Sequence, residues 1–287
     1  MKVVVLTGSR ADRGLLDPVY DELSTQGVDV YWRGATDPVE VCDCVVLLGD
    51  RHEVLHAAIG YYRERIPIAH LCGGDTSEGS YDEGFRDCLS RLATWHFVTN
   101  APAASRLAHY GNVHLVGSTG ADVLARHKTT RPLPEPYVLV SYQPETATGA
   151  NRIDEVLASL PADKVKVLFL PNDDTGSQDI TRSILRYEAG REAEHEDVIV
   201  HRSVPHALFL DLLAHCDEFI GNSSAMLYEA PFYGVKTRMV GDRQKGRVAP
   251  ILKPGASRRI SEVLIAWFKQ SKQFKQFKQS KSSQKPE

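Results

Sequence analysis

Short runs of apolar residues alternate with amphipathic segments along most of this chain. Runs such as residues 3–6 and 45–48 are continuously apolar and rich in valine, which is typical of strands buried on both faces of a sheet. Helical segments separate many of these runs, so the pattern predicts an α/β protein with parallel sheets that helices cover on both sides. We expect eleven strands, at residues 3–7, 28–32, 45–49, 67–71, 95–99, 113–117, 137–142, 165–170, 198–202, 218–221 and 237–241.

The alternation breaks at residues 129–136, where three prolines disfavour a helix. We therefore predict an N-terminal domain over residues 1–130 and a C-terminal domain over residues 131–268. Both are expected to be Rossmann-like, doubly wound domains that face a cleft, because ligands of such sheets bind beyond the carboxyl ends of the strands. Residues 269–287 contain six lysines, one glutamate and repeated Phe-Lys-Gln units, which predicts a basic, disordered tail.

Composition and charge narrow the classes of protein. With 42% hydrophobic and 25% charged residues the chain is typical of a soluble globular protein, and it shows neither an apolar run that could span a membrane nor a signal-peptide pattern. The net charge is −3, and since the tail carries +5 the body carries −8. The charge excludes nucleic-acid binding by a basic surface of residues 1–268. Nucleic acid could then be a partner only of the basic tail, or an acceptor of a transferred sugar. Five cysteines without zinc-site spacing predict reduced thiols and a cytoplasmic protein.

Polar residues follow the first and third predicted strands at their carboxyl ends. Gly8 and Arg10 come after the first strand, where glycine lets a ligand approach and arginine can bind phosphate oxygens in a bidentate manner. Asp50, Arg51 and Glu53 come after the third strand. We interpret Asp50 as an acid/base group whose charge state Arg51 maintains, and a purely structural Asp–Arg pair is the alternative.

A second group of ionisable residues follows the strand at residues 67–71. Cys72, Asp75, Glu78 and Asp82 lie there around a pair of glycines. Crowded carboxylates shift one another's pKa values and can supply an acid beside a base, whereas acidic residues at a helix N-terminus would have a structural role. Because no partner base is evident for Cys72, an inert thiol is favoured over a nucleophile.

The sequence Gly-Asn-Ser-Ser at residues 221–224 lies between an apolar run and a helical pattern at residues 225–233. This places Ser223, Ser224 and unpaired main-chain N–H groups at a helix N-terminus, which suits a phosphate group. Glu229, a turn and a half further on, is placed to accept hydrogen bonds from ribose hydroxyls. A serine N-cap and a solvated glutamate are the alternative interpretation.

These motifs, in this order, resemble the hydrolysing UDP-N-acetylglucosamine 2-epimerases from Lys2 to Arg247. The matching segments are residues 7–10, Gly14, 49–51, Glu53, 66–70, 73–74, 78–79, 82–83, 97–98, 221–224, 229–231 and 241–247. The resemblance implies a glycosyltransferase-B arrangement and a reaction that eliminates UDP from a UDP-sugar and hydrates the product to N-acetylmannosamine. It implies that the reaction needs no metal or nicotinamide cofactor. It also implies that the protein assembles as a homodimer or tetramer.

Site residues follow from the resemblance by position. It implies UDP contacts by Gly8, Arg10, Asn222, Ser223, Ser224, Glu229, Arg243 and Arg247. It implies catalytic roles for Asp50, Arg51, Glu53 and Asp82, and candidate substrate contacts by Cys72, Asp75, Glu78, Gln143 and His206.

Three departures from the family pattern keep other functions open. Cys72 stands where relatives have Glu or His, and Gln143 stands where they have His, although glutamine cannot exchange a proton near neutral pH. Only 40 positions separate Arg10 from Asp50, so about one strand–helix unit is missing and the N-terminal domain is abbreviated. The alternatives are a glycosyltransferase that acts on a large anionic acceptor such as modified DNA, and a non-catalytic protein that binds a UDP-sugar.

Overall fold

The computed structural model describes residues 1–8, 10–76, 78, 82–146, 148–172, 174–190 and 197–282. These residues form two compact units, each built on one parallel β-sheet. Unit 1 comprises Met1–Gly74, Phe85–Asp122 and Lys253–Glu287, and unit 2 comprises Asp75–Gly84 and Val123–Leu252. All eleven predicted strands are present, and their ends differ from the prediction by no more than two residues.

Unit 1 contains a six-stranded sheet in the order β2-β1-β3-β4-β5-β6. The strands are β1 (Lys2–Thr7), β2 (Asp29–Gly34), β3 (Cys44–Leu48), β4 (Ile68–Leu71), β5 (Trp95–Val98) and β6 (Val113–Leu115). The helices of this part of the chain are α1 (Arg10–Thr25), α2 (His52–Arg63), α3 (Glu83–Leu92), α4 (Ala101–Leu107), α5 (Gly120–Arg126) and α10 (Ala256–Ser282), with a short 3-10 turn at Ala108–Tyr110.

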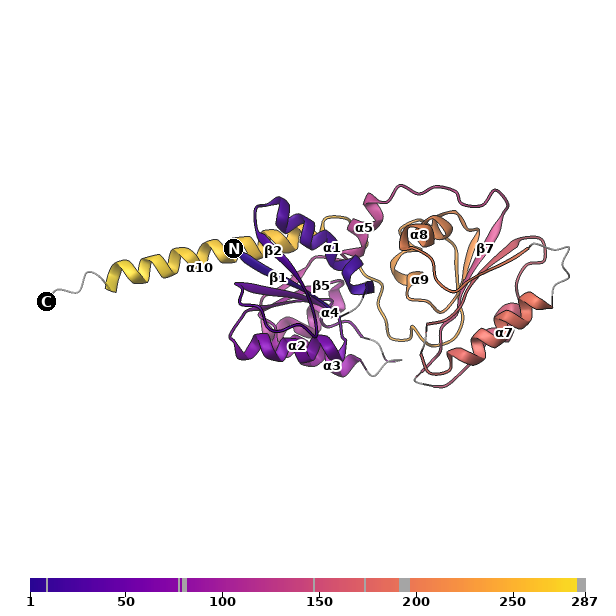
Figure 1. Cartoon of the computed structure of the whole chain (residues 1–287), viewed down its shortest axis with the longest axis horizontal. Helices are drawn as coiled ribbons and strands as arrows, with labels where there is room; N and C mark the ends of the chain where they lie inside the picture. Colours follow the sequence, from indigo (N-terminus) through magenta and orange to yellow (C-terminus); the bar gives the residue numbers. More distant parts are fainter. Residues whose placement is uncertain are drawn as a thin grey trace. The chain divides into compact units, whose positions relative to one another are not determined.

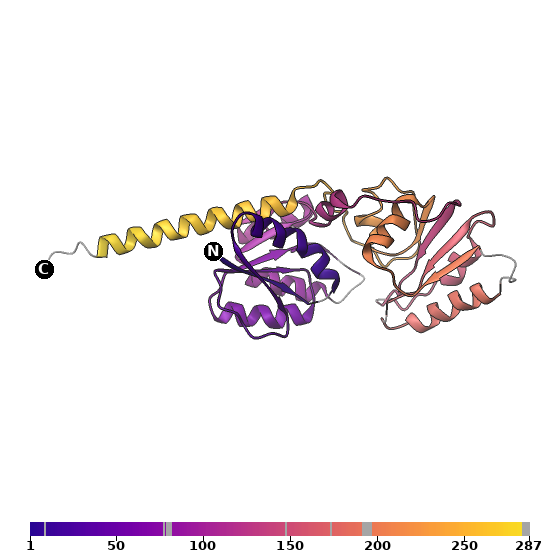
Figure 2. The same cartoon turned by 45° about the horizontal axis from the view of Figure 1, so that its top comes forward.

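Both faces of this sheet are buried, because alternate residues of each strand face opposite helix layers. Val3 and Val5 of β1 pack in one core with residues of α1 and α10, whereas Val4 and Leu6 pack in a second core with residues of α2 and α3. The continuous valine and leucine runs that identified the strands are explained by this double burial. Figures 1 and 2 both show α10 lying beside α1 and continuing past the sheet.

The two units differ from the predicted domains in the placement of the C-terminal helix. Ala256, Ile260 and Leu264 of α10 are fully buried in the same core as Leu16 and Leu23 of α1, so the helix belongs to unit 1 although it follows unit 2 in sequence. The helix also continues to Ser282, past residue 268 where the predicted tail begins. The second segment of unit 1 ends at Asp122, whose carboxylate accepts hydrogen bonds from the main-chain N–H and hydroxyl of Ser257, in the third segment, at 2.8 and 2.7 Å.

Unit 1 lacks one strand–helix unit relative to the usual doubly wound order, in which two strands lie beyond the first. Here β2 alone lies beyond β1, and residues 35–43 connect β2 to β3 without a helix. This confirms that the N-terminal domain is abbreviated, as the short spacing between Arg10 and Asp50 predicts.

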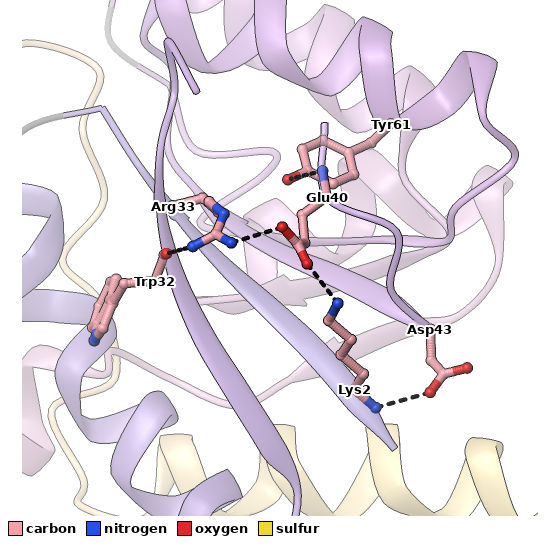
Figure 3. Close-up of polar contacts among 6 residues, drawn as sticks. All are labelled: Lys2, Trp32, Arg33, Glu40, Asp43 and Tyr61. Atoms are coloured by element: carbon pink, nitrogen blue, oxygen red, sulfur yellow. Dashed lines mark hydrogen bonds and ion pairs between the residues drawn. The ribbon is translucent and has the colours of Figure 1, made fainter. Parts of the chain in front are cut away.

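A group of hydrogen bonds and ion pairs holds the connecting segment, residues 35–43, against the sheet (Figure 3). The Glu40 carboxylate accepts hydrogen bonds from Lys2 Nζ at 2.5 Å and from Arg33 Nη2 at 2.6 Å. The Glu40 N–H faces the hydroxyl of Tyr61 on α2 at 3.5 Å, and Asp43 accepts the main-chain N–H of Lys2 at 2.8 Å. One carboxylate therefore joins the segment to two strands of the sheet.

Unit 2 contains a five-stranded parallel sheet in the order β11-β10-β7-β8-β9. The strands are β7 (Tyr137–Ser141), β8 (Val165–Phe169), β9 (Val198–His201), β10 (Glu218–Gly221) and β11 (Thr237–Met239). Helices α6 (Ile153–Ala158) and α7 (Ser177–Ala189) contribute to one core with this sheet, and α8 (His206–His215) and α9 (Ala225–Tyr228) contribute to the other. No helix within the described residues is long and apolar enough to cross a membrane.

Candidate functional site

The strand orders of both sheets indicate where a ligand would bind. In open α/β sheets, ligands bind at the point where strand order reverses, beyond the carboxyl ends of the strands. In unit 1 that point lies between β1 and β3, and in unit 2 it lies between β7 and β10. The predicted residues Gly8 and Asp50 follow β1 and β3, while Gln143 and Ser223 follow β7 and β10. The fold therefore places the predicted motifs at the two switch points.

In unit 1 the turns after β1 and β3 are in contact. A Cβ atom on Gly8 would lie 2.9 Å from Val54 and 3.4 Å from Arg51, so glycine is required for the two turns to approach this closely. The Gly8 N–H donates to Asp12 at 3.2 Å, within the first turns of α1. Arg10 begins α1, and its side chain, a predicted phosphate contact, lies outside the part of the chain that the structure describes.

Asp50 is paired with an arginine that sequence reasoning missed. Arg86 Nη2 on α3 donates to Asp50 Oδ2, and Arg86 is almost completely buried at 4% exposure. A guanidinium and a carboxylate form a charge-assisted hydrogen bond, which fixes the position of both side chains. Arg86 is therefore an ion-pair partner of Asp50, whereas the sequence analysis named Arg51 for this pairing.

Arg51 instead bonds Glu53. Its Nε donates to Glu53 Oε1 at 2.6 Å, and His52 Nδ1 lies 3.0 Å from Glu53 Oε2. Burial by itself would raise the pKa of Glu53, but hydrogen bonds from its own N–H and from Arg51, together with the nearby charge, lower that pKa below its usual value. Glu53 is therefore ionised near neutral pH, and its predicted catalytic role remains a prediction.

Four further predicted residues lie after β4. Cys72 is half-buried and has a positive φ of 63°, a conformation that is uncommon for a residue other than glycine and that often marks functional sites. The others, Asp75, Glu78 and Asp82, belong to unit 2. A Cβ atom on Gly246 would lie 2.8 Å from the Glu78 side chain. Glu78 therefore lies next to the loop that contains Arg243 and Arg247.

In unit 2 a buried asparagine joins the two strand ends at the switch point. Asn222 Oδ1 accepts the N–H of Gln143 at 2.6 Å, and Asn222 Nδ2 donates to the Gln143 carbonyl at 2.9 Å. With 0% exposure, the Asn222 side chain fixes the geometry of the site, in contrast to its predicted role as a direct UDP contact. The local reason is that the ends of parallel strands leave main-chain groups unpaired, and these need partners when buried.

The Gln143 side chain is also buried and hydrogen-bonded within unit 2. Its Oε1 accepts the N–H of Asn172 at 2.9 Å, and its Nε2 lies 3.4 Å from Ser141 Oγ. Only 7% of the residue is exposed. The structure therefore gives Gln143 a positioning role at the end of β7, and it does not support the predicted substrate contact by this side chain.

The two serines after β10 retain groups that can bind an anion. Ser223 Oγ lies 3.3 Å from the N–H of Ala225, while Ser224 makes no side-chain cap bond. Within the described part of the chain, the main-chain N–H groups of Ser223 and Ser224 have no hydrogen-bond partner. The capacity to bind an anion rests on these N–H and hydroxyl groups.

The predicted helix over residues 225–233 is too long. Helix α9 ends at Tyr228, and residues 229–234 form turns. A helix of one turn adds little dipole to the site.

Glu229 follows α9 directly and is half-buried. Burial raises the pKa of its carboxyl group to about 7. A carboxyl group with this pKa is a candidate functional group, because raised values cluster at sites where a ligand completes the environment.

The loop at residues 241–247 is held by Glu145, which sequence reasoning also missed. Glu145 is 5% exposed, and it accepts hydrogen bonds from Tyr142 Oη at 2.8 Å and from the Asp242 N–H at 2.9 Å. Arg243 Nε donates to the Pro144 carbonyl at 3.1 Å, directly after Gln143. Burial lowers the pKa of Arg243, and Arg247 contributes a second positive charge to the same loop.

The remaining predicted contact, His206, begins α8 and stacks on Phe209 with ring centroids 6.4 Å apart. The structure does not bring it into a hydrogen bond with the other predicted residues of unit 2 that it describes. No group of His, Cys, Asp or Glu side chains suited to a metal ion occurs among the described residues. All five cysteines lie in the described part, and none forms a disulfide.

Two Rossmann-like units with polar strand ends at both switch points define a fold that solved structures share. UDP-GlcNAc 2-epimerase of Methanocaldococcus jannaschii, in complex with UDP-GlcNAc and UDP, aligns with a TM-score of 0.71 at 14% identity, over 93% of this chain and 100% of that one. The enzyme of Neisseria meningitidis bound to UDP-GlcNAc aligns with a TM-score of 0.68 at 16% identity, over 94% and 92%. The fold is therefore the two-unit, glycosyltransferase-B-like fold of the UDP-GlcNAc 2-epimerases.

Sequence comparison gives the family. Residues 38–286 match the family model described as UDP-N-acetylglucosamine 2-epimerase, and the chain belongs to this family. It is 33% identical over 226 residues to UDP-N,N'-diacetylbacillosamine 2-epimerase (hydrolyzing) of Legionella pneumophila, covering 72% of this chain and 58% of that protein. It is 34% identical over 227 residues to the UDP-N-acetylglucosamine 2-epimerase of Neisseria meningitidis serogroup B, covering 71% and 57%. The matched region thus spans less than three fifths of the length of these curated relatives.

Proposed function

We propose that this protein is a hydrolysing UDP-N-acetylglucosamine 2-epimerase, which converts UDP-GlcNAc and water to N-acetylmannosamine and UDP. The observation that carries the proposal is the ion pair between Asp50 and Arg86 at the switch point of unit 1. Membership of the epimerase family and the anion-binding groups after β10 support it.

Unit 2 supplies the groups that we propose for UDP. The N–H groups and hydroxyls of Ser223 and Ser224 can donate to diphosphate oxygens, and the guanidinium groups of Arg243 and Arg247 can neutralise their charge. The carboxyl group of Glu229 can accept hydrogen bonds from the ribose hydroxyls. In the reaction these positive and donor groups stabilise UDP as it leaves.

The chemistry needs a base and an acid near C2 of the sugar. A base removes the C2 proton while UDP leaves from C1, and the C1–C2 double bond of the resulting glycal then adds a water hydroxyl at C1 and a proton at C2. We propose Asp50 and Asp82 as the acid/base groups, with Arg86 orienting the Asp50 carboxylate through their ion pair. Cys72 and Gln143 occupy positions where relatives have proton-transferring residues, so we expect slower turnover than in full-length relatives.

The elimination and the hydration involve no hydride transfer, and donor and arginine groups of unit 2 can stabilise the leaving diphosphate, so we propose that the reaction needs neither nicotinamide nor metal. Turnover in EDTA should equal turnover in its absence, and restoration of activity by a divalent cation would contradict this. The absence of disulfides fits a reducing compartment, and we therefore place the enzyme in the cytoplasm.

We also propose that the chain assembles as a homodimer or tetramer. Large apolar side chains are exposed on neighbouring elements of unit 1, namely Tyr31, Val39, Val41, Ile59 and Tyr62. They lie on β2, on the segment that connects β2 to β3 and on α2, and a second copy would bury them. Light scattering that gives the mass of a single chain at micromolar concentration would contradict this assembly.

The direct test of the proposed function follows UDP release and sugar identity with purified protein and UDP-GlcNAc. We expect UDP and N-acetylmannosamine in equal amounts. Asp50→Asn should lower kcat by about 10²-fold or more.

The proposed phosphate site is tested by a double variant. Ser223→Ala with Ser224→Ala should weaken UDP binding by about 10-fold, whereas Ser183→Ala on α7 should leave UDP binding unchanged. UDP release that requires an added acceptor would indicate a glycosyltransferase, and binding without turnover would indicate a UDP-sugar-binding protein.

A further inference from the structure

His70 is a buried histidine at the junction of three elements in unit 1. It lies on β4, next to β3 and β5 in the sheet, and has no exposed surface. Its Nε2 lies 2.8 Å from the carbonyl oxygen of Gly49, and its Nδ1 lies 3.2 Å from Ser90 Oγ on α3. A single imidazole ring thus connects the residue before Asp50 with the helix that supplies Arg86.

The hydrogen-bond partners of His70 determine which ring nitrogen carries the proton. A carbonyl oxygen can only accept, so Nε2 must carry the hydrogen that His70 donates to Gly49. In the neutral ring Nδ1 is then an acceptor, and the Ser90 hydroxyl donates to it. Burial lowers the pKa of His70 to about 4, so the ring is neutral near pH 7 and both bonds form together.

Gly49 is held from both of its main-chain groups. Its N–H donates to the carbonyl of Leu71, the last residue of β4, at 3.0 Å, and its carbonyl accepts from His70. Its φ of 84° directs the chain sharply into Asp50. The direction in which the Asp50 carboxylate leaves the sheet is therefore set by two consecutive residues of β4.

The same ring also shapes the turn after β4. A Cβ atom on Gly73 would lie 2.8 Å from His70 Nδ1 and 2.9 Å from Ser90 Oγ. Glycine at position 73 is thus needed to accommodate the bond between these two side chains. Ser90 and Arg86 are four residues apart on α3 and so lie on one face of the helix, which means that α3 holds the Asp50 turn at two points.

We propose that His70 is a positioning residue that fixes the turn carrying Asp50, by donating from Nε2 to Gly49 while Ser90 holds Nδ1. The inference deepens the proposed function, since it rests on Asp50 acting in the epimerase reaction. His70 is fully buried and does not touch the substrate. Its effect is transmitted through the main chain at Gly49.

Two isosteric variants separate this role from simple core packing. In His70→Gln the amide nitrogen reaches the position of Nε2 and can still donate to Gly49, whereas in His70→Asn the amide reaches only the position of Nδ1. We expect His70→Asn to lower kcat by roughly 10- to 100-fold, because small displacements of reacting groups have effects of this size. His70→Gln should stay within about fivefold of wild type, and the affinity for UDP, which unit 2 binds, should be unchanged in both.

Hydrogen–deuterium exchange of the peptide containing residues 49–51 supplies a readout that does not depend on activity. We expect faster exchange there in His70→Asn than in wild type or His70→Gln. His96→Asn is the matched control, because His96 is paired with His70 in the sheet register and is equally buried but has no described bond to the Asp50 turn. It should leave both kcat and the exchange of this peptide unchanged.

Wild-type kcat and wild-type exchange in His70→Asn would overturn the proposal. So would equal losses in His70→Asn, His70→Gln and His96→Asn that follow a common fall in melting temperature, since that result indicates packing alone. If the wild-type protein does not turn over UDP-GlcNAc, the proposed function fails, and the exchange experiment still decides whether His70 fixes the Asp50 turn.

Discussion

The carboxylate of Glu145 occupies the space into which a side chain at position 241 would project. A Cβ atom on Gly241 would overlap Glu145 Oε1, and Gly241 has a φ of 86° that side chains rarely adopt. Glu145 can therefore bind the Asp242 N–H only because residue 241 is a glycine. This relationship explains why the sequence of the loop at residues 241–247 begins with glycine.

Gly241→Ala should displace this loop and the arginines it contains. We expect the affinity for UDP to fall by about 10-fold or more, because the charge-assisted bonds that we propose for Arg243 and Arg247 would be lost. Gly27→Ala is the control, since Gly27 has a φ of 76° but no atom near its Cβ position. It should lower stability by about 1 kcal/mol through backbone strain and leave UDP binding unchanged. Calorimetric titration with UDP measures the difference, and equal UDP affinity in the two variants would argue against the assigned role of Glu145.

Arg86→Met should remove the partner of Asp50 while keeping most of the buried volume. We expect kcat to fall by about 10²-fold, with the dissociation constant of UDP unchanged because we assign UDP binding to unit 2. Arg86→Lys should recover part of the loss, since lysine supplies charge without the planar geometry of a guanidinium. Arg91→Met, an exposed arginine on the same helix, is the control. Steady-state kinetics with wild-type kcat in Arg86→Met would show that the pair is not needed for turnover.

Glu229 should make stability depend on pH in a characteristic direction. Its pKa of about 7 in the folded protein lies above the ordinary value of 4.5, so the folded state retains a proton that the unfolded chain releases. Stability attributable to this group therefore falls as pH rises from 4.5 to about 7 and is constant above that. Glu229→Gln should abolish this fall, and Glu155→Gln on α6 should not. Thermal unfolding at intervals between pH 5 and 8 tests this, and parallel curves for wild type and Glu229→Gln would refute it.

Glu40 should show the opposite dependence. Hydrogen bonds from Lys2 and Arg33 lower its pKa to about 2, so its contribution to stability is complete above 4.5 and is lost as pH falls towards 2. Glu40→Gln should lower the melting temperature at pH 7, and the difference from wild type should narrow below pH 4. Glu64→Gln, an exposed residue after α2, should have no effect at either pH. An equal deficit of Glu40→Gln at pH 7 and pH 3 would mean that charge is not the cause.

The strands were predictable because burial on both faces produces continuous apolar runs, as in β1 and β3. The positions of the motifs were predictable too, since the glycines at residues 8, 49 and 221 follow such runs directly. The chain length between Arg10 and Asp50 was enough to predict that one strand–helix unit is missing.

Other features depend on contacts between residues far apart in sequence. Arg86 has an ordinary helical context, and only the fold reveals that it meets Asp50. Ile260 and Leu264 give α10 an apolar face without indicating which unit buries it. Asn222 follows a strand just as Ser223 does, and burial alone distinguishes its bridging role from ligand binding. These assignments required the three-dimensional arrangement because local sequence does not specify the partner.

Proton NMR of UDP-GlcNAc turnover in D₂O tests whether the reaction proceeds through a glycal, as we propose. Elimination removes the C2 proton and hydration replaces it from solvent, so we expect UDP and N-acetylmannosamine that carries deuterium at C2. N-acetylglucosamine with its C2 proton retained would rule out the glycal, because it would show simple hydrolysis or transfer of the sugar to water.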